Sequence, residues 1–196
     1  MNILEPITQK ILKHMRENQS SFTLACRQSS KTEAIIRFAV EKVKEEDSIA
    51  KLIVIVVPKH EAINDLQRKI LDKYPCDTIR GFGCLEFRNK TNVSILRIVA
   101  GNDPTIRGMR PTLVIYDEAA FNENTLRTIA YVNCPFSHYV TSYNPKDKSF
   151  FDFVKSYPTL VINWREVHGH DPQWVINMAE HISSSDFFNE YENGKS

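Results

Sequence analysis

Two short segments carry residue types that could bind and cleave a nucleoside triphosphate. The first, residues 25–32, reads ACRQSSKT and leads into an amphipathic stretch. It matches the phosphate-binding pattern G-x-x-x-x-G-K-[ST], except that Ala25 and Ser30 stand where glycines usually stand. The second, residues 113–120, is an apolar run that ends in two adjacent carboxylates. Their order along the chain predicts the two halves of one phosphate-binding loop (P-loop) nucleotide site.

Each polar residue of these segments has an expected role. Lys31 would reach the β- and γ-phosphates, and Thr32 would give its hydroxyl to Mg²⁺. Asp117 would hold the same ion through water, and Glu118 would align and activate the water that attacks the γ-phosphate. The alternative is that these residues only open a helix and end a strand. Backbone N–H groups at the helix N-terminus would bind the phosphates, so the expected nucleotide contacts are Ala25, Cys26, Arg27, Gln28, Ser29, Ser30, Lys31 and Thr32.

Further residues are candidates for contacts around the phosphates and the base. Arg27, inside the loop, could reach the γ-phosphate in cis as a transition-state arginine, or could simply be solvated. Arg107 and Arg110 are surface candidates for the same contribution from a neighbouring subunit. Gln9 could recognise the adenine edge through its amide, although an exposed helical glutamine has many other uses. If Cys26 is accessible, bound ATP should shield its thiol from alkylation.

Composition limits the kind of protein that can carry this site. The 196 residues, 42% hydrophobic and 25% charged, suit one well-filled α/β domain. A net charge of +1 lacks the basic excess of a dedicated nucleic-acid binder, so DNA contacts should be weak and local. Four scattered cysteines without CxxC spacing favour a reducing compartment over a zinc or disulfide framework. Neither a signal peptide nor a membrane-spanning run is evident, which predicts a soluble intracellular protein.

Strand-like and helix-like segments alternate along the chain and must position these residues. The run at 51–57 is continuously apolar, which is typical of a parallel strand buried on both faces. Residues 85–88 and 93–99 flank a polar turn and predict a hairpin. This alternation predicts a doubly wound, mainly parallel α/β sheet flanked by helices. Other expected strands are 22–25, 113–117, 138–143 and 159–164. A helix is expected after Thr32, ending in the acidic run 45–47, and others at 3–16, 61–74, 125–131 and 149–156 and from 172 and 184.

The motifs together resemble the large terminase subunit, the viral ATPase that packages DNA into capsids. Residues 26–32 (CRQSSKT) resemble its phosphate loop, and residues 107–121 its Arg-Gly leader into an Asp-Glu-Ala-Ala strand. Residues 142–153 (SYNPKDKSFFDF) resemble the coupling motif, usually Ser/Thr-Thr-Pro before a Phe-rich helix. Residues 171–174 and 187–191 resemble the end of the ATPase domain. Two departures are Ser30 in place of glycine and Tyr143-Asn144 in place of Thr-Pro.

The resemblance implies a RecA/terminase-like P-loop fold and an ATP-hydrolysing motor that uses Mg²⁺. It implies that Ser142, with Asn144 in the same motif, senses the nucleotide state and couples it to movement. Implied partners are double-stranded DNA, the capsid portal and the small terminase subunit, with a homo-oligomeric ring on assembly and a monomer in isolation. The location would be the host cell, in the cytoplasm for a phage and the nucleus for a eukaryotic virus. The family's C-terminal nuclease domain is not in this sequence, which we interpret as one ATPase domain over residues 1–196.

Two other functions remain open. A helicase-like DNA-dependent ATPase would share the site, but such enzymes close it with a second RecA-like lobe that this sequence does not contain. Ser30 instead motivates a degenerate module that binds ATP without hydrolysing it. Steady-state phosphate release separates the motor from the binding module.

Overall fold

The computed structural model describes most of the chain. It covers residues 4–168 except 47, 48, 123, 133 and 145, and also residues 173 and 183. The helices expected from 172 and 184, and the segments 171–174 and 187–191, therefore lie essentially outside the described residues. Within the described part, no helix is both long enough and apolar enough to cross a membrane.

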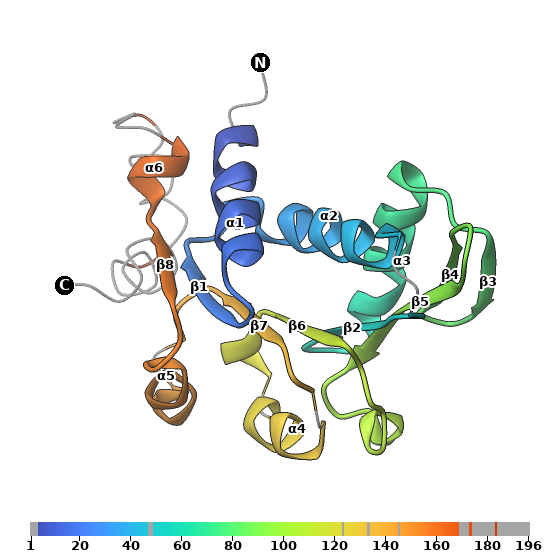
Figure 1. The fold of residues 1–196 in the computed structure, drawn as a ribbon. Helices are drawn as coiled ribbons and strands as arrows, with labels where there is room; N and C mark the ends of the chain where they lie inside the picture. The colour runs from blue at the N-terminus through green and yellow to red at the C-terminus, as the bar shows by residue number, and fades with distance from the viewer. Residues whose placement is uncertain are drawn as a thin grey trace.

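One mixed sheet organises the described residues (Figure 1). Its strands are β1 (Ser21–Ala25), β2 (Leu52–Val57), β3 (Thr78–Gly81), β4 (Cys84–Arg88), β5 (Val93–Ala100), β6 (Leu113–Asp117), β7 (Ser137–Thr141) and β8 (Thr159–Ile162). Their spatial order is β3-β4-β5-β2-β6-β7-β1-β8. The six strands from β5 to β8 in that order are parallel, while β3 and β4 add an antiparallel edge. The predicted fold class is confirmed.

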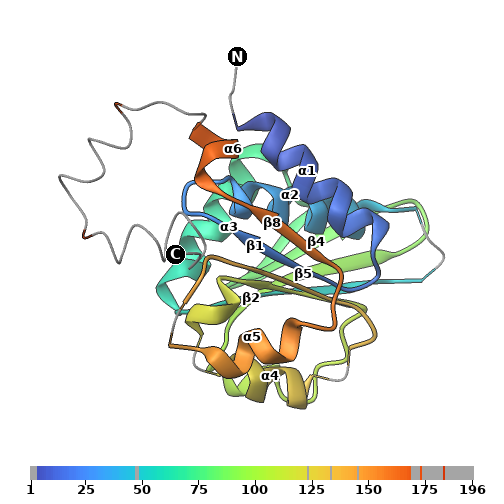
Figure 2. The ribbon, with the colours of Figure 1, turned by 90° about the vertical axis from the view of Figure 1, so that its left-hand side faces the viewer.

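Helices cover both faces of the sheet. They are α1 (Glu5–Glu17), α2 (Lys31–Lys44), α3 (Glu61–Lys73), α4 (Thr125–Tyr131), α5 (Lys148–Val154) and α6 (Trp164–His168), with 3₁₀ turns η1 (Pro104–Ile106) and η2 (Ala119–Phe121). In Figure 1, α1, α2 and α3 lie above the sheet and α4 and α5 below it, and the turned view of Figure 2 agrees. This is why β2 is buried on both faces: Ile53, Ile55 and Val57 pack toward the first layer, Val54 and Val56 toward the second.

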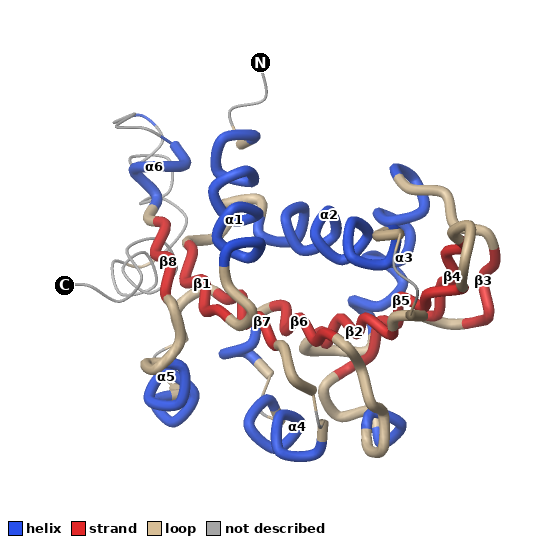
Figure 3. Tube along the Cα trace, viewed as in Figure 1, coloured by secondary structure: helices blue, strands red, loops and turns tan. Residues whose placement is uncertain are grey.

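The antiparallel edge was only partly predicted. The β4–β5 hairpin is confirmed, with Phe87 opposite Ser94 and Leu85 opposite Leu96. The edge strand β3 was missed, because all four of its residues are exposed and so show no alternation of buried and polar positions. Figure 3 shows β3 and β4 at the end of the sheet farthest from β8.

Two predicted strands end earlier than expected, and a polar side chain explains the first. The strand predicted at 159–164 stops at Ile162, and α6 begins at Trp164. Asn163 accepts hydrogen bonds from the backbone N–H groups of Arg165 (3.0 Å) and Glu166 (3.3 Å) through Oδ1, so it caps the new helix. The strand predicted at 138–143 likewise stops at Thr141. A hydrogen bond from the next residue, Ser142, to Glu118 accounts for this early end.

Candidate functional site

The predicted phosphate loop connects β1 to α2 at the carboxyl edge of the sheet. Its backbone has a left-handed conformation at Gln28 (φ +60°) and again at Ser30 (φ +59°). The buried Ser29 hydroxyl donates to the carbonyl of Cys26 at 2.7 Å and closes the turn. Cys26 has no exposed surface, so its thiol does not meet the condition of accessibility on which the expected ATP-shielded alkylation depends.

Lys31 is folded inward beneath this loop. Its side chain is only 6% exposed, and its ammonium donates to the carbonyls of Ala25 (3.3 Å) and Cys26 (3.0 Å). It also donates to the hydroxyl of Ser142 at 2.8 Å. Most oxygen partners of this ammonium are neutral. The side chain can therefore turn toward a phosphate without breaking any backbone hydrogen bond of the helix. Ala25 and Cys26 thus supply the backbone carbonyl groups that hold Lys31 in place.

Glu118 faces Lys31 from the end of β6. Its Oε1 lies 3.3 Å from the Lys31 ammonium. Its Oε2 accepts the backbone N–H of Ser142 at 2.9 Å and lies 3.4 Å from the Thr141 hydroxyl. Glu118 itself has φ +49°, a left-handed backbone conformation that is rare for a residue with a side chain. Such strained positions concentrate at functional sites, and this one turns the carboxylate toward the loop.

Ser142 joins the two halves of the site. Its hydroxyl accepts from Lys31, and its backbone N–H donates to Glu118. Because that N–H binds a carboxylate rather than a neighbouring strand, β7 ends at Thr141, two residues before the predicted end. Asn144 donates through Nδ2 to the carbonyl of Ala120 at 2.6 Å and so ties the segment after β7 to the segment after β6.

Asp117 is a buried carboxylate whose negative charge a bound cation would stabilise. Its Oδ1 is buried and has no hydrogen-bond partner within the described part of the chain. Burial, and next the neighbouring charge of Glu118, raise the pKa of this carboxyl group to about 7. No group of three or more His, Cys, Asp or Glu side chains among the described residues could form an all-protein metal site. Mg²⁺ bound by one carboxylate, one hydroxyl and phosphates needs no such group, so Asp117 and Thr32 fit it.

A cavity of about 820 Å³ opens over the loop. The predicted residues Arg27, Lys31, Thr32 and Glu118 line it together with the rest of the loop's outer side. Sequence reasoning missed the remainder of the lining, which comes from the start of α1, from the segment between β2 and α3, from the first turn of α3, and from η2. These residues are Leu4, Pro58, Lys59, Ala62 and Phe121. Most are apolar, and none was assigned a role from its motif, so only the fold brings them to the site.

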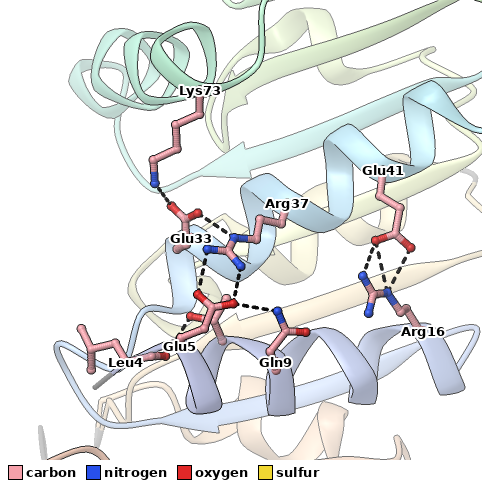
Figure 4. A network of polar contacts seen from close by, with 9 residues as sticks. Leu4, Glu5, Gln9, Arg16, Glu33, Arg37, Glu41 and Lys73 are labelled. Carbon is pink, nitrogen blue, oxygen red and sulfur yellow. Dashed lines mark hydrogen bonds and ion pairs between the residues drawn. The ribbon is translucent and has the colours of Figure 1, made fainter. Parts of the chain in front are cut away.

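Gln9 is not among the residues that line this cavity in the described structure. Its amide donates to Glu5 at 2.8 Å, as Figure 4 shows, and Glu5 in turn accepts from Arg37 of α2 at 2.6 Å. Arg37 also donates to Glu33 at 2.8 Å. The network fixes the start of α1, where Leu4 lines the cavity, against the first turns of α2. Gln9 therefore takes part in the polar network that holds α1 against α2, and its contact with adenine stays a prediction.

The two candidate trans arginines also lie away from the cavity lining. Arg107 stacks on the ring of Tyr131, with its guanidinium carbon 4.7 Å from the ring centroid. Arg110 is exposed just before β6. Both residues are exposed, and their contribution in trans stays a prediction.

Replacing Ser30 with glycine tests the loop strain. A left-handed residue that carries a Cβ costs about 1–2 kcal/mol, and Ser30 at φ +59° makes no side-chain hydrogen bond that caps α2. We expect Ser30→Gly to tighten ATP binding or speed hydrolysis, with little change in thermal stability, in calorimetric titration and steady-state assays. Ser30→Ala, which keeps the Cβ and loses the hydroxyl, is the control and should bring no gain. A fall in ATP affinity for both variants would mean that the hydroxyl binds phosphate.

Comparison with known proteins identifies the fold. No protein-family profile and no curated protein sequence matches the chain. Among solved structures, the large terminase ATPase domain of Thermus phage P74-26 is similar with a TM-score of 0.65 and 15% identity, over 93% of this chain and 92% of that one. The large terminase of a thermophilic bacteriophage, in complex with ADP, gives a TM-score of 0.69 and 12% identity, over 95% of this chain and 52% of that one. The chain thus spans about half the length of that second protein.

A more distant likeness links the chain to another class of ATPase. The SWI2/SNF2 ATPase core of Sulfolobus solfataricus, in complex with double-stranded DNA, gives a TM-score of 0.53 and 12% identity, over 86% of this chain and 36% of that one. The terminase likeness is stronger by TM-score and coverage. The predicted resemblance to terminase ATPase domains is therefore confirmed at the level of the fold.

Proposed function

We propose that this chain is an ATP-hydrolysing motor domain that powers the translocation of viral DNA into a capsid. The observation that carries the proposal is the junction at Ser142, which contacts both Lys31 and Glu118. One residue of the segment predicted to couple nucleotide state to movement thus touches the expected phosphate ligand and the expected water-activating group. The terminase-like fold supports the same function.

The contacts suggest how hydrolysis would proceed. On ATP binding, Lys31 would exchange the carbonyls of Ala25 and Cys26 for the β- and γ-phosphates. Glu118, held by the N–H of Ser142, would orient the attacking water and accept its proton. Mg²⁺, held by Thr32 and Asp117, would neutralise charge that develops on the phosphates. When Lys31 leaves the Ser142 hydroxyl, the segment after β7 loses a contact, and this would be the first step of coupling.

The remaining roles extend this proposal to the assembled motor. Arg27, which lines the cavity, would contact the γ-phosphate in cis, and Arg107 or Arg110 would act on a neighbouring subunit in a ring. The portal, the small terminase subunit and double-stranded DNA would be partners inside a host cell. Residues 1–196 would form one ATPase domain, monomeric on its own and weak on DNA because its net charge is only +1.

Phosphate release in steady state tests the proposal. We expect the chain alone to release phosphate from ATP slowly, because no neighbouring subunit completes the site. The release should depend on Mg²⁺ and should be abolished by a chelator. Duplex DNA should bind weakly at physiological salt, and sub-micromolar affinity would contradict the proposal. The chain with Asp117→Asn is the control for metal dependence, since the variant removes the carboxylate expected to hold Mg²⁺.

A non-hydrolysing ATP-binding module is the second candidate, and the strained Ser30 favours it. In that case the chain would bind ATP with Mg²⁺ but release no phosphate, with or without partner proteins. A helicase-like DNA-dependent ATPase, to which the SWI2/SNF2 likeness points, would instead show strong stimulation by DNA without a portal. The same assay therefore separates all three functions.

A further inference from the structure

One wall of the nucleotide cavity carries a cation that no motif predicted. Lys59, between β2 and α3, lines the cavity beside Pro58 and Ala62. Its side chain is exposed, and its ammonium makes no hydrogen bond or ion pair with any other described residue. This contrasts with Lys31 on the opposite side, which is buried and has four oxygen partners. Lys59 is thus an available positive charge facing the site.

The order of the strands places Lys59 relative to the phosphates. β1, β7, β6 and β2 are parallel neighbours in that order, so their carboxyl ends share one edge of the sheet. The phosphate loop follows β1, Ser142 follows β7, Glu118 follows β6, and Lys59 follows β2. Lys59 therefore lies one strand beyond Glu118, on the side away from the loop. Figure 1 shows the same separation, with α1 and the start of α2 near β1 and α3 near β2.

The chemistry of a triphosphate fixes which part of it would meet this residue. The loop binds the β-phosphate, and the γ-phosphate lies where Glu118 can orient water toward it. A charge one strand beyond Glu118 then faces the γ-phosphate and not the nucleoside, which must lie toward the loop and Leu4. Phe121, 40% exposed, also lines the cavity and adds apolar surface to it.

We infer that Lys59 contacts the γ-phosphate in cis and makes the site prefer nucleoside triphosphates over diphosphates. The inference rests on the proposed nucleotide-binding function and names a ligand for one phosphate of that substrate. Arg27 and Lys31 would approach the γ-phosphate from the loop, and Lys59 would add a third cation from the side beyond Glu118. A lysine suits this position because its flexible stem lets the ammonium follow the phosphate during transfer.

Nucleotide affinities of Lys59 variants test the inference. Lys59→Ala should lower the affinity for ATPγS about tenfold, the usual effect of losing one charge-assisted hydrogen bond, and leave the affinity for ADP within about twofold. Lys59→Arg should restore most of the ATPγS affinity because it keeps the charge. Lys90→Ala, on an exposed turn and 85% exposed, is the matched control and should change neither. Calorimetric titration with Mg²⁺ present measures all four proteins.

The outcomes separate this inference from the proposed function. An equal loss of affinity for ADP and ATPγS in Lys59→Ala would overturn it, because a γ-phosphate ligand cannot affect a diphosphate. Unchanged affinities for both nucleotides would overturn it as well. In either case the unaltered chain still binds nucleotide, and the proposed function stands. If the unaltered chain binds neither nucleotide, the proposed function itself fails.

Discussion

Replacing Lys31 with alanine is expected to abolish nucleotide binding. The ammonium is the cation that would face the β- and γ-phosphates, and a charge-assisted contact of this kind contributes about 1.5–3 kcal/mol. Loss of two such contacts would weaken ATP binding by about a hundredfold or more. Titration of the variant with ATP and Mg²⁺ measures this effect.

Stability must be measured alongside, because Lys31 has a second role in the nucleotide-free protein. The variant leaves the carbonyls of Ala25 and Cys26 and the hydroxyl of Ser142 without their donor. Unpaired groups of this kind cost about 1–3 kcal/mol unless water replaces the donor. Lys13→Ala, on the exposed face of α1, is the control. Retained ATP affinity in a folded Lys31→Ala protein would contradict the assignment of the phosphate loop.

The parts of the fold that follow from local patterns were predictable. The continuously apolar run of β2 and the helical spacing in α2 and α3 predict their elements to within one or two residues. Strand β3 was not predictable in this way, because an exposed edge strand carries no burial pattern. The early ends of β7 and β8 each depend on one polar side chain: Glu118 accepts the N–H of Ser142, and Asn163 accepts two N–H groups at the start of α6.

The site also combines residues that local motifs indicate with residues that only the fold brings together. Lys31, Glu118 and Ser142 stand in motifs, so their residue types and spacing alone indicate their chemistry. Their mutual contacts depend on strand order, which brings the ends of β1, β6 and β7 together. Lys59 and Phe121 were given no role by a motif, and they reach the cavity only because β2 adjoins β6 and η2 follows it. The left-handed conformation of Glu118 is equally invisible in a sequence, since nothing in the residue type favours it.

The Glu118→Gln variant is expected to bind ATP and Mg²⁺ normally and to hydrolyse ATP more slowly by about two to four orders of magnitude. General-base catalysis contributes a factor of this size. The amide oxygen can still accept the N–H of Ser142, which Glu118 now accepts at 2.9 Å, so the local backbone should be kept. Of the roles expected in catalysis, the variant loses the ability to accept a proton from the attacking water. Single-turnover hydrolysis and equilibrium binding, measured on the same sample, separate the two effects.

Glu17→Gln provides the matched control, because Glu17 is 60% exposed on α1 and pairs only loosely with Lys13 at 3.8 Å. It should hydrolyse ATP at the parent rate. The ion pair between Lys31 and Glu118 at 3.3 Å adds a second expectation. Without that carboxylate, Lys31 breaks one ion pair fewer when it turns to the phosphates, so the affinity of Glu118→Gln for ATP should not fall below that of the parent. A variant that hydrolyses as fast as its parent would show that another group activates the water, and one that no longer binds ATP would place Glu118 among the binding residues instead.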